Sequence, residues 1–137
     1  MNRTDFQQIA ELRLRESKAL LSAGFSDGAY YLAGYAVECA LKACVAKRTQ
    51  EHDFPEKGSA KYYSHDLEDL LDFAKLRTEL EQVFVTDKSM RTNWTILQNW
   101  SEESRYERGK TDRDATDLLA AIEDSTGGLL PWLRQRW

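Results

Sequence analysis

The stretch from Ala29 to Ala46 reads AYYLAGYAVECALKACVA, and sixteen of its eighteen residues are apolar or glycine. Only Glu38 and Lys42 are charged. A helix that is apolar on nearly all sides lies inside a core, because a surface helix keeps one polar face. We therefore predict that this stretch is the central helix of the fold, and that Ser26 caps its start.

The composition also favours helices over strands. The chain has 17 Leu and 14 Ala against 4 Val and 3 Ile, and straight-chain residues and alanine lose the least conformational freedom in a helix. Its 137 residues fit one compact domain and leave little room for a second. We expect residues 1–137 to form a single all-α domain.

Capping residues and apolar periodicity predict further helices. Thr4 begins a sequence with capping-box spacing, and Gly24 ends the helix that follows. After a loop over residues 48–63, Ser64 caps a short helix. A second short helix covers residues 76–84, because its apolar residues recur every three or four positions.

The C-terminal third reads as two more helices. Asp87 begins the first, and a capping box at Thr111-x-x-Asp114 begins the second. The apolar stripe that follows keeps one helical phase from Ala115 to Leu133, across Gly127-Gly128. This phase predicts one long final helix with a kink near Pro131, where a backbone N–H is missing.

The charge balance limits the function classes. With 23 acidic and 19 basic residues, the net charge is −4, which disfavours coating nucleic acid by bulk charge. The segment 105–113 is the exception, because it holds four basic and two acidic residues. The chain has no apolar run long enough to cross a bilayer and no signal-peptide pattern, so we expect a cytoplasmic protein without membrane association.

The two cysteines, Cys39 and Cys44, lie five residues apart. On a helix they point about 140° away from each other, which disfavours a disulfide and predicts two buried thiols. The cysteines and the two histidines, His52 and His65, do not have the spacing of zinc ligands. We therefore predict no metal site and no cofactor.

Three segments in this order resemble the HEPN (higher eukaryotes and prokaryotes nucleotide-binding) family. Residues 28–43 are similar to its Ala/Tyr-rich central helix with the pattern A-V-E-x-A-L-K-A. Residues 64–71, SHDLEDLL, are similar to its S-H-D-L-x-x-L-L helix start. Trp100 followed by Arg105-Tyr106 is similar to the aromatic and Arg-Tyr segment before its last helix.

The resemblance implies a four- to five-helix up-and-down bundle that forms a homodimer. It also implies a protein of toxin–antitoxin-like systems, whose members are often ribonucleases paired with a minimal nucleotidyltransferase or another antitoxin. The family's active site lies at the dimer interface and combines an Arg-x4–6-His motif with a polar pair such as Glu-x3-Lys. Partners implied for this chain are therefore a second copy, a nucleotide or RNA, and a nucleotidyltransferase-type antitoxin.

Only one of the two family motifs is present. Glu38-x3-Lys42 matches the polar pair, whereas the histidine positions counted from Arg105 fall on Lys110, Thr111 and Asp112. Neither lysine nor threonine replaces histidine well as a proton acceptor near neutral pH. We therefore predict a binding module that lacks the family's usual ribonuclease chemistry and has no assigned catalytic residue.

The candidate nucleotide- or RNA-binding residues come from the central helix and the basic segment. Glu38 and Lys42 at i and i+4 also fit a simple buried ion pair or a dimer contact, and the basic segment also fits a solvated loop. Arginine grips phosphate bidentately, and the helix start after Thr111 favours anions. The candidate residues are Glu38, Lys42, Arg105, Tyr106, Arg108 and Lys110.

Two other functions remain open at this stage. One is a ribonuclease toxin with a variant site, in which Arg105 holds phosphate and Lys110 or His65 assists. His65 beside a helix start otherwise fits a cap or an edge histidine. The other is an oligomerisation partner that only holds another chain.

Overall fold

The computed structural model describes residues 1–49 and 64–137. All elements of regular secondary structure in these two ranges are helices, which confirms the predicted all-α class. None of the described helices is long and apolar enough to cross a bilayer. In chain order the helices are α1 (Arg3–Ser22), α2 (Ser26–Arg48), α3 (Leu67–Phe73), α4 (Arg77–Thr86), α5 (Lys88–Gln98), the 3-10 helix η3 (Glu102–Tyr106), α6 (Asp112–Glu123) and α7 (Leu129–Arg134).

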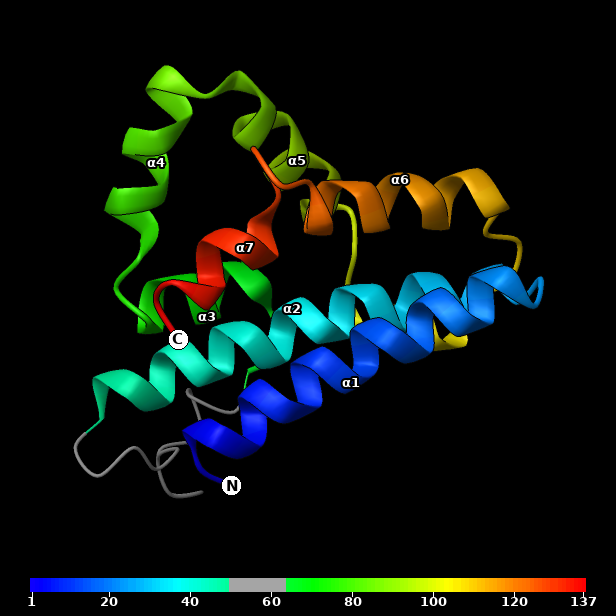
Figure 1. The fold of residues 1–137 in the computed structure, drawn as a ribbon, viewed down its shortest axis with the longest axis horizontal. Helices are drawn as coiled ribbons and strands as arrows, with labels where there is room; N and C mark the ends of the chain where they lie inside the picture. Colours follow the sequence, from blue (N-terminus) through cyan, green and yellow to red (C-terminus); the bar gives the residue numbers. More distant parts are fainter. Residues whose placement is uncertain (50–63) are drawn as a thin grey trace.

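The two longest helices form the base of the fold. Figure 1 shows α1 and α2 side by side and antiparallel, with α6 and α7 lying over α2 and α4 standing at one end. The last residue returns to the first helix, where Arg3 Nη2 donates to the backbone oxygen of Trp137 at 2.7 Å. Both chain ends therefore lie on the same side of the molecule (Figure 1).

Helix α2 is central, as its apolar sequence predicted. It contacts α1, α3, η3, α6 and α7, and its residues are buried on all sides from Ala36 to Ala46. Its start differs from the prediction, because Phe25 occupies the N-cap position and Ser26 is the first helical residue. The Ser26 hydroxyl instead donates to Asp112 at the start of α6, which joins two helix N-termini.

The predicted caps were partly wrong. Asn2, not Thr4, caps α1 in a capping box with Asp5, because the helix starts earlier than its apolar residues suggest. Asp66, not Ser64, caps α3, since its carboxylate accepts from two backbone N–H groups in the first turn. The cap of α5 by Asp87 and the capping box that begins α6 are confirmed.

The predicted long final helix was wrong. Helix α6 ends at Glu123, and α7 begins only at Leu129. A Cβ at Gly128 would overlap with backbone atoms of Asp124, so the chain turns tightly at this point. The apolar stripe keeps its phase because α6 and α7 both pack on α2. Pro131 lies in the first turn of α7, where its missing N–H costs no hydrogen bond.

Candidate functional site

One stripe of α2 carries polar side chains in an otherwise apolar helix. Tyr31, Tyr35, Glu38 and Lys42 follow one another at spacings of four, three and four residues, which places them on one side of the helix. The two tyrosines are half-buried, whereas Glu38 is 0% and Lys42 8% exposed. Lys42 Nζ donates to Glu38 Oε2 at 3.1 Å, so the predicted i, i+4 ion pair is present.

His65 reaches the same carboxylate from the segment before α3. Its Nδ1 lies 3.1 Å from Glu38 Oε2, and its Nε2 lies 3.3 Å from Glu102 Oε2 in η3. A neutral imidazole carries one N–H, so only the doubly protonated ring donates to both carboxylates. The His65 side chain is 48% exposed, which leaves it open to solvent. We call Glu38, Lys42, His65 and Glu102 the Glu38 cluster.

The second oxygen of Glu38 has no hydrogen-bond partner among the described residues. Glu38 Oε1 is buried, and burial of a polar atom without a partner is uncommon, because water is lost and nothing replaces it. The neighbouring groups experience the charge of this carboxylate. Burial above all, and then the charge of Glu38, raises the pKa of the Cys39 thiol to about 12.

A close contact between Gly34 and Trp100 positions η3 over α2. A Cβ on Gly34 would overlap with the indole ring, so only glycine lets Trp100 lie against the helix backbone. Trp100 Nε1 donates to the Tyr31 carbonyl oxygen at 3.2 Å, and the two rings stack with centroids 6.1 Å apart. Glu102 follows Trp100 by two residues, and this contact therefore brings it to His65.

Arg105 and Tyr106 form the exposed edge of the site. The Arg105 guanidinium lies 4.8 Å from the centroid of the Tyr106 ring, which is part of a 73% exposed residue. Burial raises the pKa of the Tyr31 hydroxyl, and the nearby charge of Arg105 opposes that rise. Arg105 thus lies beside Tyr31, on the polar stripe of α2, and leaves its charge accessible to a ligand.

The structure separates the remaining two predicted residues from the Glu38 cluster. Lys110 Nζ lies 4.4 Å from the centroid of the Tyr30 ring and 3.4 Å from a carboxylate oxygen of Glu107. Its backbone N–H donates to Asp27 Oδ1 at 2.8 Å. Tyr30 precedes Glu38 by eight residues, or about 12 Å along a helix. Arg108 is exposed in the same outer segment.

Sequence reasoning missed two members of the cluster. His65 was predicted as a cap or edge histidine and appeared only in the ribonuclease alternative, and Glu102 was not predicted. The S-H-D-L segment was a usable signal for His65, because it belongs to the same family pattern as Glu38. Glu102 gave no comparable signal, since acidic residues before a charged loop are common on any surface.

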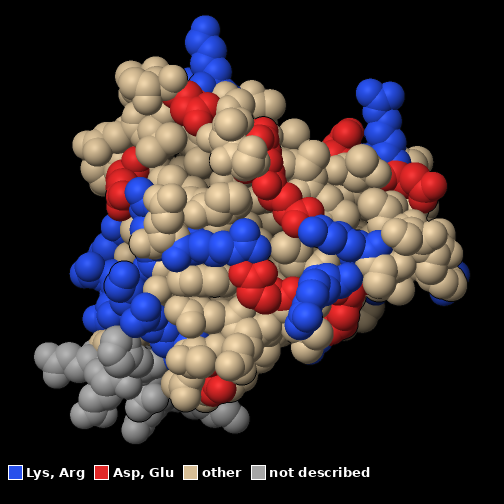
Figure 2. All heavy atoms as spheres, viewed as in Figure 1, with Lys and Arg blue, Asp and Glu red and all other residues tan. Residues whose placement is uncertain are grey.

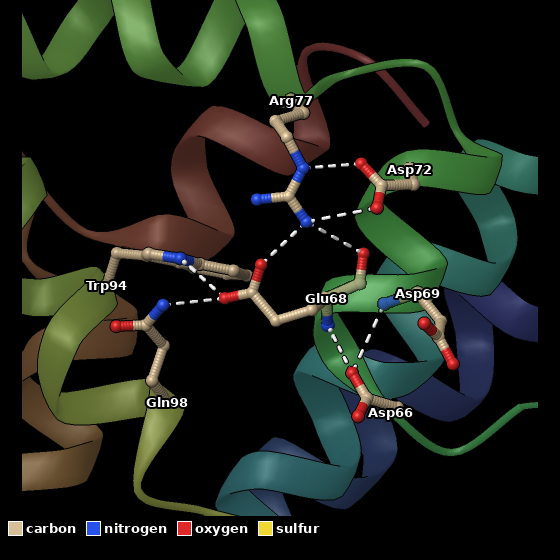
Figure 3. Close-up of polar contacts among 7 residues, drawn as sticks. All are labelled: Asp66, Glu68, Asp69, Asp72, Arg77, Trp94 and Gln98. Atoms are coloured by element: carbon tan, nitrogen blue, oxygen red, sulfur yellow. Dashed lines mark hydrogen bonds and ion pairs between the residues drawn. The ribbon is translucent and has the colours of Figure 1, made fainter.

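A second polar network lies next to the cluster and differs from it. Glu68 in α3 accepts from Trp94 Nε1 at 3.2 Å and from Gln98 Nε2 at 2.6 Å through one oxygen (Figure 3). Its other oxygen accepts from Arg77 Nη2 at 2.7 Å. Arg77 also binds Asp72 and thereby lowers the pKa of that carboxyl group. We call these five residues the Glu68 network.

The cysteines fit the predicted structural role. Cys39 and Cys44 are free and buried, and burial raises the pKa of each thiol to about 12. A thiol with such a pKa stays protonated near neutral pH and is a weak nucleophile or metal ligand. Within residues 1–49 and 64–137, no three histidine, cysteine, aspartate or glutamate side chains are grouped as metal ligands.

Comparison with known families agrees with this geometry. A family model described as HEPN domain matches residues 4–124, which is most of the chain. The protein therefore belongs to the HEPN family. No curated protein and no solved structure matches it.

Proposed function

We propose that this protein is a cytoplasmic, homodimeric HEPN module that binds a nucleotide or RNA, or a partner protein, in a toxin–antitoxin-like system. It would do so without the Arg-x4–6-His motif of the family's ribonucleases. The observation that carries the proposal is the buried Glu38 carboxylate, of which one oxygen is shared by Lys42 and His65 and the other has no described partner.

The residues around Glu38 fit the chemistry of a nucleotide. Glu38 itself is buried, but the partly exposed Glu102 carboxylate and His65 ring that surround it can form hydrogen bonds with ribose hydroxyls or base edges. The Arg105 guanidinium offers bidentate contacts to a phosphate, and the exposed Tyr106 ring offers a surface on which a base stacks. Arg108 and Lys110 would extend this positive surface along the segment before α6.

The dimer and the partner follow from the family resemblance. A homodimer would place two Glu38 clusters near one interface, and a nucleotidyltransferase-type protein would be the antitoxin. Light scattering on the purified protein measures the mass of the assembly. A monomer at micromolar concentration would contradict the homodimer.

A binding and cleavage assay tests the proposed site. We expect Arg105→Ala to weaken binding of a fluorescein-labelled oligoribonucleotide at least fivefold, because a bidentate phosphate contact is lost. The matched control Arg15→Ala removes an exposed arginine of α1 and should change binding less than twofold. Equal binding by both variants would contradict the site, and robust RNA cleavage that Arg105→Ala abolishes would contradict the non-catalytic module.

One observation favours a second candidate, a ribonuclease with a variant active site. His65 lies between two carboxylates, an environment that suits a proton-transferring imidazole beside a phosphate held by Arg105. Lys110 fits this role less well, because it lies against Tyr30. This candidate predicts toxic expression that His65→Ala relieves while the protein stays folded. Absence of cleavage and of toxicity without any antitoxin would refute it.

A further inference from the structure

A basic pocket lies at the C-terminal end of α2, away from the Glu38 cluster. The pocket has a volume of about 530 Å³ and lies between the end of α2, the turn from α3 to α4 and the residues after α7. Figure 2 shows positively charged side chains gathered on this side of the molecule. The residues that line it are Cys44, Lys47, Arg48, Ala74, Lys75, Leu76, Glu79, Gln135 and Arg136.

Most of the positive charge in the basic pocket is not neutralised by the residues that the structure describes. Among the described residues, Arg136 is the one of its four basic residues that forms an ion pair, with its Nε and Nη2 at 2.9 and 2.6 Å from Glu79 Oε1. Lys47, Arg48 and Lys75 are exposed and have no ion pair with any residue that the structure describes. Three such cations around one hollow attract a ligand with several negative charges, although the whole chain carries a net charge of −4.

Lys75 occupies a backbone conformation that favours glycine. Its φ is +60°, the one left-handed non-glycine residue in the described ranges. The turn is a Schellman motif, because Leu76 N–H donates to the Leu71 carbonyl oxygen at 3.2 Å and Lys75 N–H to the Asp72 carbonyl oxygen at 3.0 Å. Glycine would meet this requirement without strain. A lysine at this position strains the backbone, and its side chain lines the pocket.

Helix-end electrostatics favours each cation of this cluster, but it does not explain why cations from two helix ends line one pocket. Lys47 and Arg48 lie in the last turn of α2, where cations interact favourably with the helix dipole. Lys75 lies at the C-terminal end of a different helix, α3, where the carboxylate of nearby Asp72 is bound to Arg77. Besides the hydrogen bond from Arg77, the charge of Lys75 helps to lower the pKa of Asp72, but Lys75 forms no ion pair with any residue that the structure describes.

We propose that the basic pocket binds phosphate groups, either of a free polyphosphate such as that of a nucleotide or of an RNA backbone. Lysine ammonium groups act as point charges for phosphate, and Arg48 adds a bidentate donor. Its volume lies in the range of small-ligand sites. Lys47 follows Glu38 by nine residues, which on a helix is the opposite side and about 13.5 Å along the axis. The pocket is therefore a second site, independent of the function proposed above.

The test uses inorganic tripolyphosphate and a labelled twelve-nucleotide oligouridylate as probes. The variant Lys47→Gln/Arg48→Gln/Lys75→Gln removes three cations of the pocket, and Arg15→Gln/Lys88→Gln/Arg91→Gln removes three exposed cations elsewhere. We expect the first to weaken tripolyphosphate binding at least tenfold and the second less than twofold. For the oligonucleotide, the plot of log binding constant against log salt concentration has a negative slope, and its magnitude should decrease by about 2 in the first variant only.

The two probes separate the two sources of phosphate. Tripolyphosphate binding without oligouridylate binding identifies a free polyphosphate, and loss of both in the pocket variant identifies a site that also accepts the RNA backbone. If both triple variants weaken binding equally, binding depends on the total charge of the protein and not on the pocket, and the proposal is overturned. Absence of binding of either probe by the unmodified chain at physiological salt would also overturn it.

Lys75→Gly provides a variant that does not threaten the fold. We expect its thermal midpoint to rise, because glycine relieves the left-handed strain, while tripolyphosphate binding weakens at least threefold. Circular dichroism measures the midpoint, and calorimetry measures the binding. A higher thermal midpoint with unchanged tripolyphosphate binding would show that Lys75 does not contact the ligand, and would overturn its assignment to the site.

Discussion

Glu38 and Glu68 are both helical glutamates that accept hydrogen bonds from distant parts of the chain, yet their surroundings differ. Glu68 is partly exposed, and both of its oxygens are occupied by donors from α4 and α5 (Figure 3). Glu38 is fully buried, and one of its oxygens has no described partner. Glu68, the partly exposed group, has both of its oxygens hydrogen-bonded, whereas the buried Glu38, for which hydrogen bonding matters more, has one oxygen without a described partner.

This difference separates structural from functional polar groups. The Glu68 network joins α3, α4 and α5 and occupies both oxygens of Glu68, so this carboxylate needs no ligand. The Glu38 cluster retains a buried acceptor without a partner among the described residues, next to a histidine whose side chain is 48% exposed. The following variants break or sharpen this comparison, in order of expected effect.

The largest effect is expected for Glu38→Ala. It leaves the ammonium of Lys42 buried without its partner, which costs about 3–5 kcal/mol of unfolding free energy. Urea denaturation followed by circular dichroism measures the loss. As a control, Glu38→Leu with Lys42→Met removes both charges and should recover most of the stability. A double variant as unstable as Glu38→Ala would show that packing, not the uncompensated charge, dominates.

Gly34→Ala should have the next largest effect. Alanine is the better helix former by about 1 kcal/mol, so an uncrowded site would gain stability. Here the new methyl group overlaps with the Trp100 ring, and displacing that ring should give a net loss of about 1–3 kcal/mol. Gly28→Ala, elsewhere in α2, serves as the control, because its Cβ would meet only one flexible leucine atom. A stability gain in Gly34→Ala would refute the role of Trp100 in positioning η3.

For Glu68→Ala we expect a smaller loss, about 1–2 kcal/mol. The buried indole N–H of Trp94 loses its acceptor, whereas Gln98 and Arg77 can turn to water or to Asp72. Glu68→Gln keeps a carbonyl oxygen for Trp94 and should lose less. Because the Glu68 network is structural, neither variant should alter oligoribonucleotide binding. If a Glu68 variant is fully folded but binds the oligoribonucleotide more weakly, the Glu68 network is part of the candidate site.

The smallest effect concerns pH. Hydrogen bonding from Arg77 holds the pKa of Asp72 below its ordinary value in the folded state. The folded pKa is lower than the unfolded one, so this stabilisation is present above the unfolded pKa of about 4 and is lost as the pH falls through the folded pKa. The pair is exposed, so Asp72→Asn should cost less than about 1 kcal/mol at pH 7. The urea midpoints of the two proteins should approach each other as the pH falls below about 4, and a constant difference would contradict this account.

Much of the fold could be predicted because its signals are local. The apolar run of α2 predicted its central burial, and the i, i+4 spacing of Glu38 and Lys42 predicted their ion pair. The capping box at Thr111 and Asp114 depends on residues three apart, and the structure has it as predicted. These features need only the helix itself, whose hydrogen bonds and side-chain periodicity follow from neighbouring residues.

Other features depended on contacts between distant segments. The break after Glu123 was missed because an apolar stripe in constant phase describes one long helix and two helices on a common core equally well. The meeting of Glu38, His65 and Glu102 joins residues up to 64 positions apart, and no periodicity contains that information.

The sequence by itself therefore determined the helical class, the family, the buried central helix and the charged pair within it. Only the tertiary structure decided that His65 and Glu102 complete that pair, that Lys110 lies elsewhere, and that Lys75 faces a basic pocket. The physical reason is the distance along the chain over which the deciding interactions act. Helix formation is governed by interactions over about four residues, whereas a site is assembled by packing, which selects among many arrangements of the same helices.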